Sequence, residues 1–322
     1  MTMRSLVGSA LILTALVSSA ARAEQPPIMA HIGVLTPLGD QSAEDGLREG
    51  LSELGYIEGK NLSFEWRRYE QSGEALRAAA ADLARSRVDI IVAVGTQAAR
   101  AAISATSSIP IVFVSGDPVA SGLAASLAHP GANATGLSSQ TADLMAKRLE
   151  LLHQIAPRAR RVIMLVNPEG PVHAAVLRET QKAGRTLRMD VVALNAGNPE
   201  QLGAALRNVQ RTPGTALIVS SDVFFIANRN QIGNAVRSAK LPTLVPNKDY
   251  WSEGVLMAYG SGLKELDHRA SIYIDKILKG AKPADLPIEQ GSVKLVIDVR
   301  VARELGLKVP QELLYRADEV IQ

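Results

Sequence analysis

Residues 88–119, VDIIVAVGTQAARAAISATSSIPIVFVSGDPV, contain the pattern from which the architecture follows. Two continuous apolar runs, Ile90–Val94 and Ile111–Val114, flank an alanine-rich segment. Continuous apolar runs are typical of strands that are buried on both faces of a parallel sheet. Because neighbouring parallel strands need a crossover between them, the segment between the runs is predicted to be a helix, and the unit is βαβ.

The same alternation extends in both directions from this unit. On its amino-terminal side, we predict strands at Ile32–Leu35 and Leu62–Trp66. A helix carrying Leu47, Leu51 and Leu54 ends at Gly55, and an alanine-rich helix covers Glu74–Arg85. On the carboxyl-terminal side, we predict strands at Val162–Val166, Val191–Leu194, Leu217–Val219 and Thr243–Val245, with helices at Val172–Leu187 and Leu263–Leu278.

Two turn-rich segments suggest where the chain divides. Residues 129–136, HPGANATG, suit a crossover between two halves, and Pro283, Pro287 and Gly291 mark a second boundary. The predicted fold class is α/β, with two Rossmann-like lobes built on parallel sheets. The predicted division is a signal peptide at 1–23, an amino-terminal lobe at 28–136 plus 262–288, and a carboxyl-terminal lobe at 137–261 plus 289–322.

The amino-terminus has the order of a secretory signal. Arg4 supplies a positive charge, Leu6–Val17 is apolar, and Ala21-Arg22-Ala23 offers small residues where a signal peptidase cleaves. A membrane anchor is the alternative, but a bilayer core needs about 20 apolar residues and this run is shorter. We therefore expect cleavage near Glu24 and a mature protein in the periplasm without a membrane anchor.

Composition narrows the class of partner. Net charge is +3 over 322 residues, and removal of Arg4 and Arg22 with the signal leaves +1. The basic residues are scattered among acids, so we expect no nucleic-acid partner. The sequence has no cysteine, which removes both disulfides and the lipid-acceptor residue of a lipoprotein. A freely diffusing monomer without a cofactor is the prediction.

Ligands of open parallel sheets bind beyond the carboxyl ends of the strands. Small polar residues follow the apolar runs there: Thr96, Gln97, Ser115, Asp117, Asn167, Ser221, Asp222 and Asn247. Any one of them alone is better explained as an ordinary turn or helix N-cap residue, but the set facing one crevice from two lobes indicates a ligand site. Thr96 is predicted to cap a helix beginning at Gln97, whose free N–H groups would suit a ligand carboxylate. Asp117 and Asp222 would either face a ligand ammonium or cap helices.

Aromatic residues and catalytic motifs say less about the ligand site than the polar strand ends do. Tyr259, Phe224 and Phe225 lie near predicted strand ends, where they would stack on a ligand ring or pack in the core. The five histidines have no metal-ligand spacing, and no thiol nucleophile, G-x-S-x-G elbow or complete dinucleotide fingerprint occurs. These observations favour a binding protein over an enzyme.

Several motifs resemble one family closely. Besides Ile32–Leu35, they are GLREGLSELGYIEGKN at 46–61, VDIIVAVGTQAAR at 88–100, IPIVFVSGDPV at 109–119, LKGAKPADL at 278–286 and RADEVI at 316–321. In this order they resemble the tryptophan/tyrosine-type ABC transporter substrate-binding proteins over nearly the whole mature chain. Relatives often have Arg-Pro-Gly-Gly-Asn at 129–133 and Pro-Thr-Lys-Phe at 291–294, where this chain has HPGAN and GSVK.

The resemblance implies a type I periplasmic binding fold with crossovers near Gly136, Gly260 and Glu289. It also implies a pocket that uses Leu38, Gly39 and Asp45 after the first strand, and Tyr259 in the second lobe, together with the polar residues above. The function implied is capture of a small molecule, such as an amino acid or an aromatic or carboxylate compound, by hinge closure. The permease subunits of an ABC importer would be the partner. A periplasmic enzyme or a ligand sensor on the same two-lobed fold is the alternative.

Overall fold

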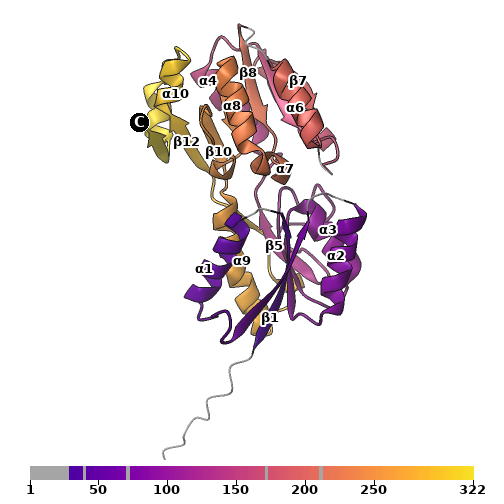
Figure 1. The fold of residues 1–322 in the computed structure, drawn as a ribbon. Coiled ribbons are helices and arrows are strands. Elements are labelled where there is room, and N and C mark those ends of the chain that lie inside the picture. Colours follow the sequence, from indigo (N-terminus) through magenta and orange to yellow (C-terminus); the bar gives the residue numbers. More distant parts are fainter. Residues whose placement is uncertain (1–28, 39–40, 70–72, 171–172, 210–212) are drawn as a thin grey trace, which may run out of the picture.

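A computed structural model describes residues 29–322 apart from 39–40, 70–72, 171–172 and 210–212. The predicted signal peptide therefore lies outside the described residues, as does Gly39. The chain forms two α/β lobes stacked end to end, with the amino-terminal lobe below the carboxyl-terminal lobe in Figure 1. Each lobe contains its own sheet, with helices packed against both faces of it.

The amino-terminal lobe is built on a six-stranded sheet of order β11-β5-β4-β3-β1-β2, in which every pairing is parallel. Its strands are β1 (Ala30–Pro37), β2 (Leu62–Tyr69), β3 (Ile90–Val94), β4 (Ile111–Ser115), β5 (Ala134–Ser138) and β11 (Glu289–Gln290). Both faces of the central strands are buried, which explains their continuous apolar sequence: Val34 packs on one face, whereas Leu35 packs on the other.

Helices α2 (Glu74–Arg85) and α3 (Thr96–Ala105) cover one face of this sheet, and α1 (Gln41–Glu53) and α9 (Leu263–Leu278) cover the other. Helices α1 and α9 approach closely because α1 presents glycine to α9. A Cβ atom added at Gly50 would lie 2.4 Å from the carbonyl oxygen of His268. A short 3₁₀ turn, η2 (Pro283–Asp285), follows α9. The amino-terminal lobe is therefore completed by a helix from near the end of the chain.

The carboxyl-terminal lobe has a seven-stranded sheet of order β13-β12-β10-β9-β8-β6-β7. Its strands are β6 (Arg161–Val166), β7 (Asp190–Asn195), β8 (Thr215–Val219), β9 (Thr243–Val245), β10 (Met257–Gly260), β12 (Lys294–Asp298) and β13 (Glu319–Ile321). The pairing of β10 with β12 is antiparallel, and the other pairings are parallel. The prediction of parallel sheets thus holds for most of the strands.

Helices also cover both faces of the second sheet. They are α4 (Met145–Ile155), α5 (His173–Thr186), α6 (Pro199–Asn208), α7 (Val223–Ala227), α8 (Arg229–Ala239), α10 (Val299–Glu304) and α11 (Gln311–Arg316), with the 3₁₀ turn η1 (Lys248–Tyr250). Core residues of α4, α5, α10 and α11 pack on one face, and those of α6, α7 and α8 pack on the other.

The chain crosses between the lobes three times: after β5, after β10 and after β11. The first and third crossings differ from the predicted boundaries. Leu137 and Ser138, predicted for the second lobe, still pair with β4, and Glu289 and Gln290 pair with β5. Small side chains fill β5, so its sequence lacks the apolar run that identified the other strands. The two-lobed α/β fold itself is confirmed.

Candidate functional site

The carboxyl ends of the first lobe's strands bring several predicted residues together. In the parallel register, Val94 of β3 lies beside Val114 of β4, which places Thr96 next to Ser115 and Gly116. The Thr96 Oγ1 accepts a hydrogen bond from the Gly116 N–H at 3.4 Å. Ser115 is 3% exposed, and its Oγ has no hydrogen-bond partner among the described residues. A buried hydroxyl without a partner is costly, and Ser115 shares this property with Thr36, Thr215 and Ser261 among the described residues.

The predicted N-cap at Thr96 is wrong by one residue. Thr96 is the first residue of α3, and Gly95 occupies the N-cap with φ 99°, so that no side chain caps the helix. A glycine tolerates this left-handed conformation, which a β-branched threonine would not. The first N–H groups of α3 therefore donate no hydrogen bond to an N-cap side chain. Tyr69, which the sequence analysis missed, also lies here, and its hydroxyl donates to the Val94 carbonyl at 2.9 Å.

Asp117 holds the first crossover against the amino-terminal lobe. Its Oδ2 accepts a hydrogen bond from the Ala142 N–H at 3.0 Å, and only 8% of the residue is exposed. Burial raises the pKa of this carboxyl, and the N–H of Ala142 opposes that rise. One of the carboxylate's oxygens is thus committed to the backbone of a hinge segment.

In the carboxyl-terminal lobe, Asn167 and Asp222 form a pair at the ends of β6 and β8. The Asn167 Nδ2 donates to Asp222 Oδ2 at 3.1 Å, and its Oδ1 accepts from the Glu169 N–H at 3.1 Å. Asp222 caps α7 by accepting from the Phe224 N–H at 2.9 Å, so the capping alternative holds for this residue. Burial raises the pKa of the Asp222 carboxyl, and Ser221 lies beside it, half-buried.

The two sets of strand ends face each other. The Gln97 Nε2, in the first turn of α3, donates to the carbonyl oxygen of Glu169 at 3.2 Å. Glu169 follows β6 and is two residues from Asn167. This contact joins the loop after β3 to the loop after β6, and therefore joins the polar edges of the two lobes.

The other predicted residues lie less centrally. Asn247 caps η1 and donates from Nδ2 to the Ser261 carbonyl at 2.7 Å, beside the second crossover. Tyr259 is half-buried and packs against the core of the second lobe. Leu38 is 50% exposed after β1, and Asp45 accepts from Gln41 within α1. Phe225 is fully buried and packs against Phe224, so its role is core packing.

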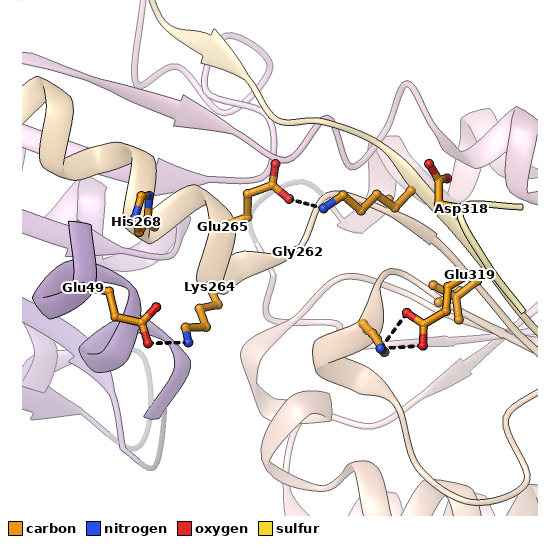
Figure 2. Close-up of a pocket in the computed structure, with 12 residues that line it drawn as sticks. Glu49, Gly262, Lys264, Glu265, His268, Asp318 and Glu319 are labelled. Carbon is orange, nitrogen blue, oxygen red and sulfur yellow. Dashed lines mark hydrogen bonds and ion pairs between the residues drawn. The ribbon is translucent and has the colours of Figure 1, made fainter. Parts of the chain in front are cut away.

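A cavity of about 730 Å³ lies elsewhere between the lobes, beside α9 and the β10-β12-β13 edge. Figure 2 shows its charged lining, which none of the predicted site residues joins. The lining residues are Glu49, Lys248, Ala258, Gly260, Gly262, Lys264, Glu265, His268, Lys294, Val296, Asp318 and Glu319.

Six of the charged residues around this cavity form three ion pairs. Lys264 pairs with Glu49 at 2.7 Å within the first lobe, and Lys248 pairs with Glu319 at 2.7 Å within the second. Glu265 of α9 pairs with Lys294 of β12 at 2.8 Å and so joins the two lobes. A ligand here would have to displace existing ion pairs, which makes the strand-end site the better candidate.

No group of His, Asp or Glu side chains in the described part of the chain is arranged to hold a metal ion. No helix among the same residues is long and apolar enough to cross a membrane.

Two Rossmann-like lobes, joined by three crossovers and facing each other with polar strand ends, define a protein of the type I periplasmic binding fold. The chain belongs to the ABC transporter substrate binding protein family, whose model matches residues 32–321. The resemblance found in the sequence motifs is thereby confirmed.

Known relatives agree with this assignment. A tyrosine-binding protein of Clostridioides difficile (strain R20291) is 23% identical over 76% of this chain and 71% of its own length. A Streptococcus pneumonia ABC domain in complex with L-Trp overlays with a TM-score of 0.83, at 24% identity over 91% of this chain and 99% of that one. The ligand-free, open structure of a Clostridium difficile substrate binding protein with adhesive properties overlays with a TM-score of 0.66, at 21% identity over 91% of this chain and 99% of that one.

Proposed function

We propose that this protein captures an aromatic amino acid between the facing strand ends and delivers it to the permease of an ABC importer. The observation that carries the proposal is the contact of Gln97 with the Glu169 carbonyl, because it brings the polar edges of both lobes together. Two of the relatives, a tyrosine-binding protein and a domain in complex with L-Trp, support an aromatic amino acid as the ligand.

The chemistry of the strand ends suits a carboxylate. The N-terminus of α3 carries backbone N–H groups without a side-chain cap, and a helix N-terminus favours an anion. The Ser115 hydroxyl, which is buried and has no hydrogen-bond partner in the described part of the chain, is a further donor beside it. A micromolar complex requires about −8 kcal/mol, which a few charge-assisted hydrogen bonds and one buried ring can supply.

Delivery follows from closure of the lobes and needs no reaction. Ligand would bind one lobe first, and the other would rotate over it as the crossovers absorb the change in backbone angles. The closed pair of lobes would then dock on the permease. We propose that the protein performs no chemistry on its ligand and that it works in the periplasm as a freely diffusing monomer, after cleavage near Glu24.

Ligand binding can be tested with a variant that removes two hydroxyls, Thr96→Ala with Ser115→Ala. Both side chains are small, so the fold should tolerate the change. We expect L-tryptophan or L-tyrosine at about 100 times its Kd to add about 2.7 kcal/mol to the stability of the wild type. The double variant should lose most of this ligand-induced stabilisation in a thermal-shift assay while its own melting without ligand stays cooperative.

A matched control addresses the charged cavity. Lys248→Met with Lys264→Met removes two of its charges, each from an ion pair within one lobe, and should leave the ligand-induced shift unchanged, because these residues lie away from the strand ends. Loss of the ligand-induced shift in this control, with a normal shift in the hydroxyl variant, would indicate that the ligand binds in the charged cavity. Conversion of the ligand to a product by the wild type would replace the transport proposal with an enzyme.

A further inference from the structure

The largest fully buried side chain of the described residues is a charged one, Arg148. It lies in α4, the first helix after the first crossover, and is 1% exposed. Burial lowers the pKa of its guanidinium to about 10, so the group is still positively charged at neutral pH. A buried charge is costly unless it is compensated, and its partners therefore indicate its role.

The guanidinium is held by backbone carbonyls from three separate segments. Its Nε donates to Tyr259 at 2.9 Å, its Nη1 to Thr141 at 3.4 Å, and its Nη2 to Pro246 at 3.3 Å. Thr141 belongs to the first crossover, and Tyr259 precedes the second crossover directly. One planar side chain thus joins the backbone of the first crossover to the ends of β9 and β10, and the second crossover begins at the end of β10.

Nearby residues are adapted to this arrangement. Gly260 has φ 154°, and a Cβ atom there would lie 2.2 Å from the Pro246 carbonyl oxygen and 2.9 Å from Arg148 Nη2. Asp117 holds the first crossover from the other side, through the Ala142 N–H that follows Thr141. The first crossover is therefore fixed by Asp117 in one lobe and by Arg148 in the other.

No ion pair among the described residues includes Arg148, although the charge of Asp117 acts on it from a distance. Replacement of buried ionic groups by apolar ones is often neutral or stabilising, so stability alone does not explain an arginine here. A fork of donors that reaches three carbonyls does offer fixed geometry.

We propose that Arg148 is a hinge-positioning residue, whose guanidinium ties the first and second crossovers together so that the carboxyl-terminal lobe rotates as one body when ligand is captured. The inference rests on the proposed function for its consequence in binding. Without the tie, the crossovers would move independently, and the closed arrangement would form less often.

Three variants of the full mature protein test this role. Arg148→Met keeps the length of the side chain and removes all of its donors. Arg148→Lys keeps the charge but cannot reach all three carbonyls. Lys147→Met is the control, because Lys147 lies next to Arg148 on α4 but pairs with Glu150 at the surface.

Hydrogen–deuterium exchange without ligand is the first measurement. We expect both Arg148 variants to exchange faster at residues 139–144 and 256–262, with the strands of either lobe as protected as in the wild type. The control should match the wild type throughout. Faster exchange spread over the whole second lobe would overturn the inference, and so would unchanged exchange at the crossovers in Arg148→Lys. If Arg148→Met does not fold, the exchange of Arg148→Lys alone tests the inference.

Binding of L-tryptophan and L-tyrosine is the second measurement, by calorimetry together with the radius of gyration from X-ray scattering. If the closed form becomes about tenfold rarer, the Kd should rise about tenfold and ligand should compact the protein less. A purely structural role would lower the melting temperature but leave Kd and compaction unchanged. Failure of the wild type to bind either amino acid would refute the proposed ligand, while the exchange experiment would still decide the role of Arg148.

Discussion

Replacing Gly50 by alanine would place a methyl group where α1 touches α9. The added Cβ would lie 2.4 Å from the His268 carbonyl oxygen and 2.4 Å from the Ser271 hydroxyl. Overpacking of this kind costs about 1–3 kcal/mol, because helices must separate to relieve it. Alanine favours the helix over glycine by about 1 kcal/mol, which offsets part of that cost. We expect a net loss of up to about 2 kcal/mol in the free energy of unfolding.

Gly203 in the interior of α6 provides a matched control. A Cβ atom there would meet only the end of the Arg207 side chain at 3.4 Å and that of Gln231 at 3.9 Å. Both contacts are with flexible side chains, so alanine should keep its helix propensity without a clash. The same substitution in the second lobe should therefore stabilise the protein by up to about 1 kcal/mol.

Urea unfolding followed by tryptophan fluorescence would separate the lobes. The sequence has two tryptophans, Trp66 in β2 of the first lobe and Trp251 after η1 in the second. In a Trp251→Phe background, Trp66 reports the lobe that contains Gly50, and in a Trp66→Phe background, Trp251 reports the lobe that contains Gly203. The midpoint should fall for Gly50→Ala and rise for Gly203→Ala. A higher midpoint for Gly50→Ala would refute the close packing of α1 on α9.

Two further perturbations test a helix cap and an ion pair. Burial alone would raise the pKa of the Asp298 carboxyl, but hydrogen bonds from Arg300 and from the Val301 N–H hold it below its ordinary value. Asp298→Ala should therefore lower the free energy of unfolding by about 1–2 kcal/mol at neutral pH, measured by urea unfolding. This difference from the wild type should shrink as the pH falls below about 4, because the carboxylate becomes protonated. A difference that grows in acid would contradict this explanation. Glu265 and Lys294 form an ion pair between the lobes, and both side chains are partly exposed. A double-mutant cycle should therefore give a coupling energy below about 1 kcal/mol, which decreases further in high salt. A larger coupling energy that does not depend on salt would show that this ion pair holds the two lobes in their relative orientation.

The sequence predicts the strands of this fold well where burial on both faces demands apolar residues. The strands Thr243–Val245 and Ile90–Val94 have the predicted bounds. Strand β5 was not predicted, because its small residues, ATGLS, resemble a turn. Its burial depends on pairing with β4, which local sequence does not encode.

The candidate site shows the same limit. Thr96 and Ser115 lie together because parallel strand ends meet at one edge, which the sequence predicts. The N-cap at Gly95 depends on a backbone angle that the sequence does not reveal. Arg148 was missed, although a signal existed: Met145, Arg148, Leu149 and Leu152 recur at helical spacing on the face of α4 that becomes buried.

Helix α9 completes the first lobe but is synthesised long after the other helices of that lobe. Leu47 and Leu51 of α1 share their core with Leu266, Ala270 and Ile274 of α9, so that face of the first sheet stays only partly covered until residue 278 has been made. At roughly 5–20 residues per second, translation from the end of β5 to the end of α9 takes about 7–28 seconds. A ribosome-bound chain cannot complete its first lobe during that time. For the export to the periplasm that we propose, this order of synthesis would postpone folding until most of the chain has been made.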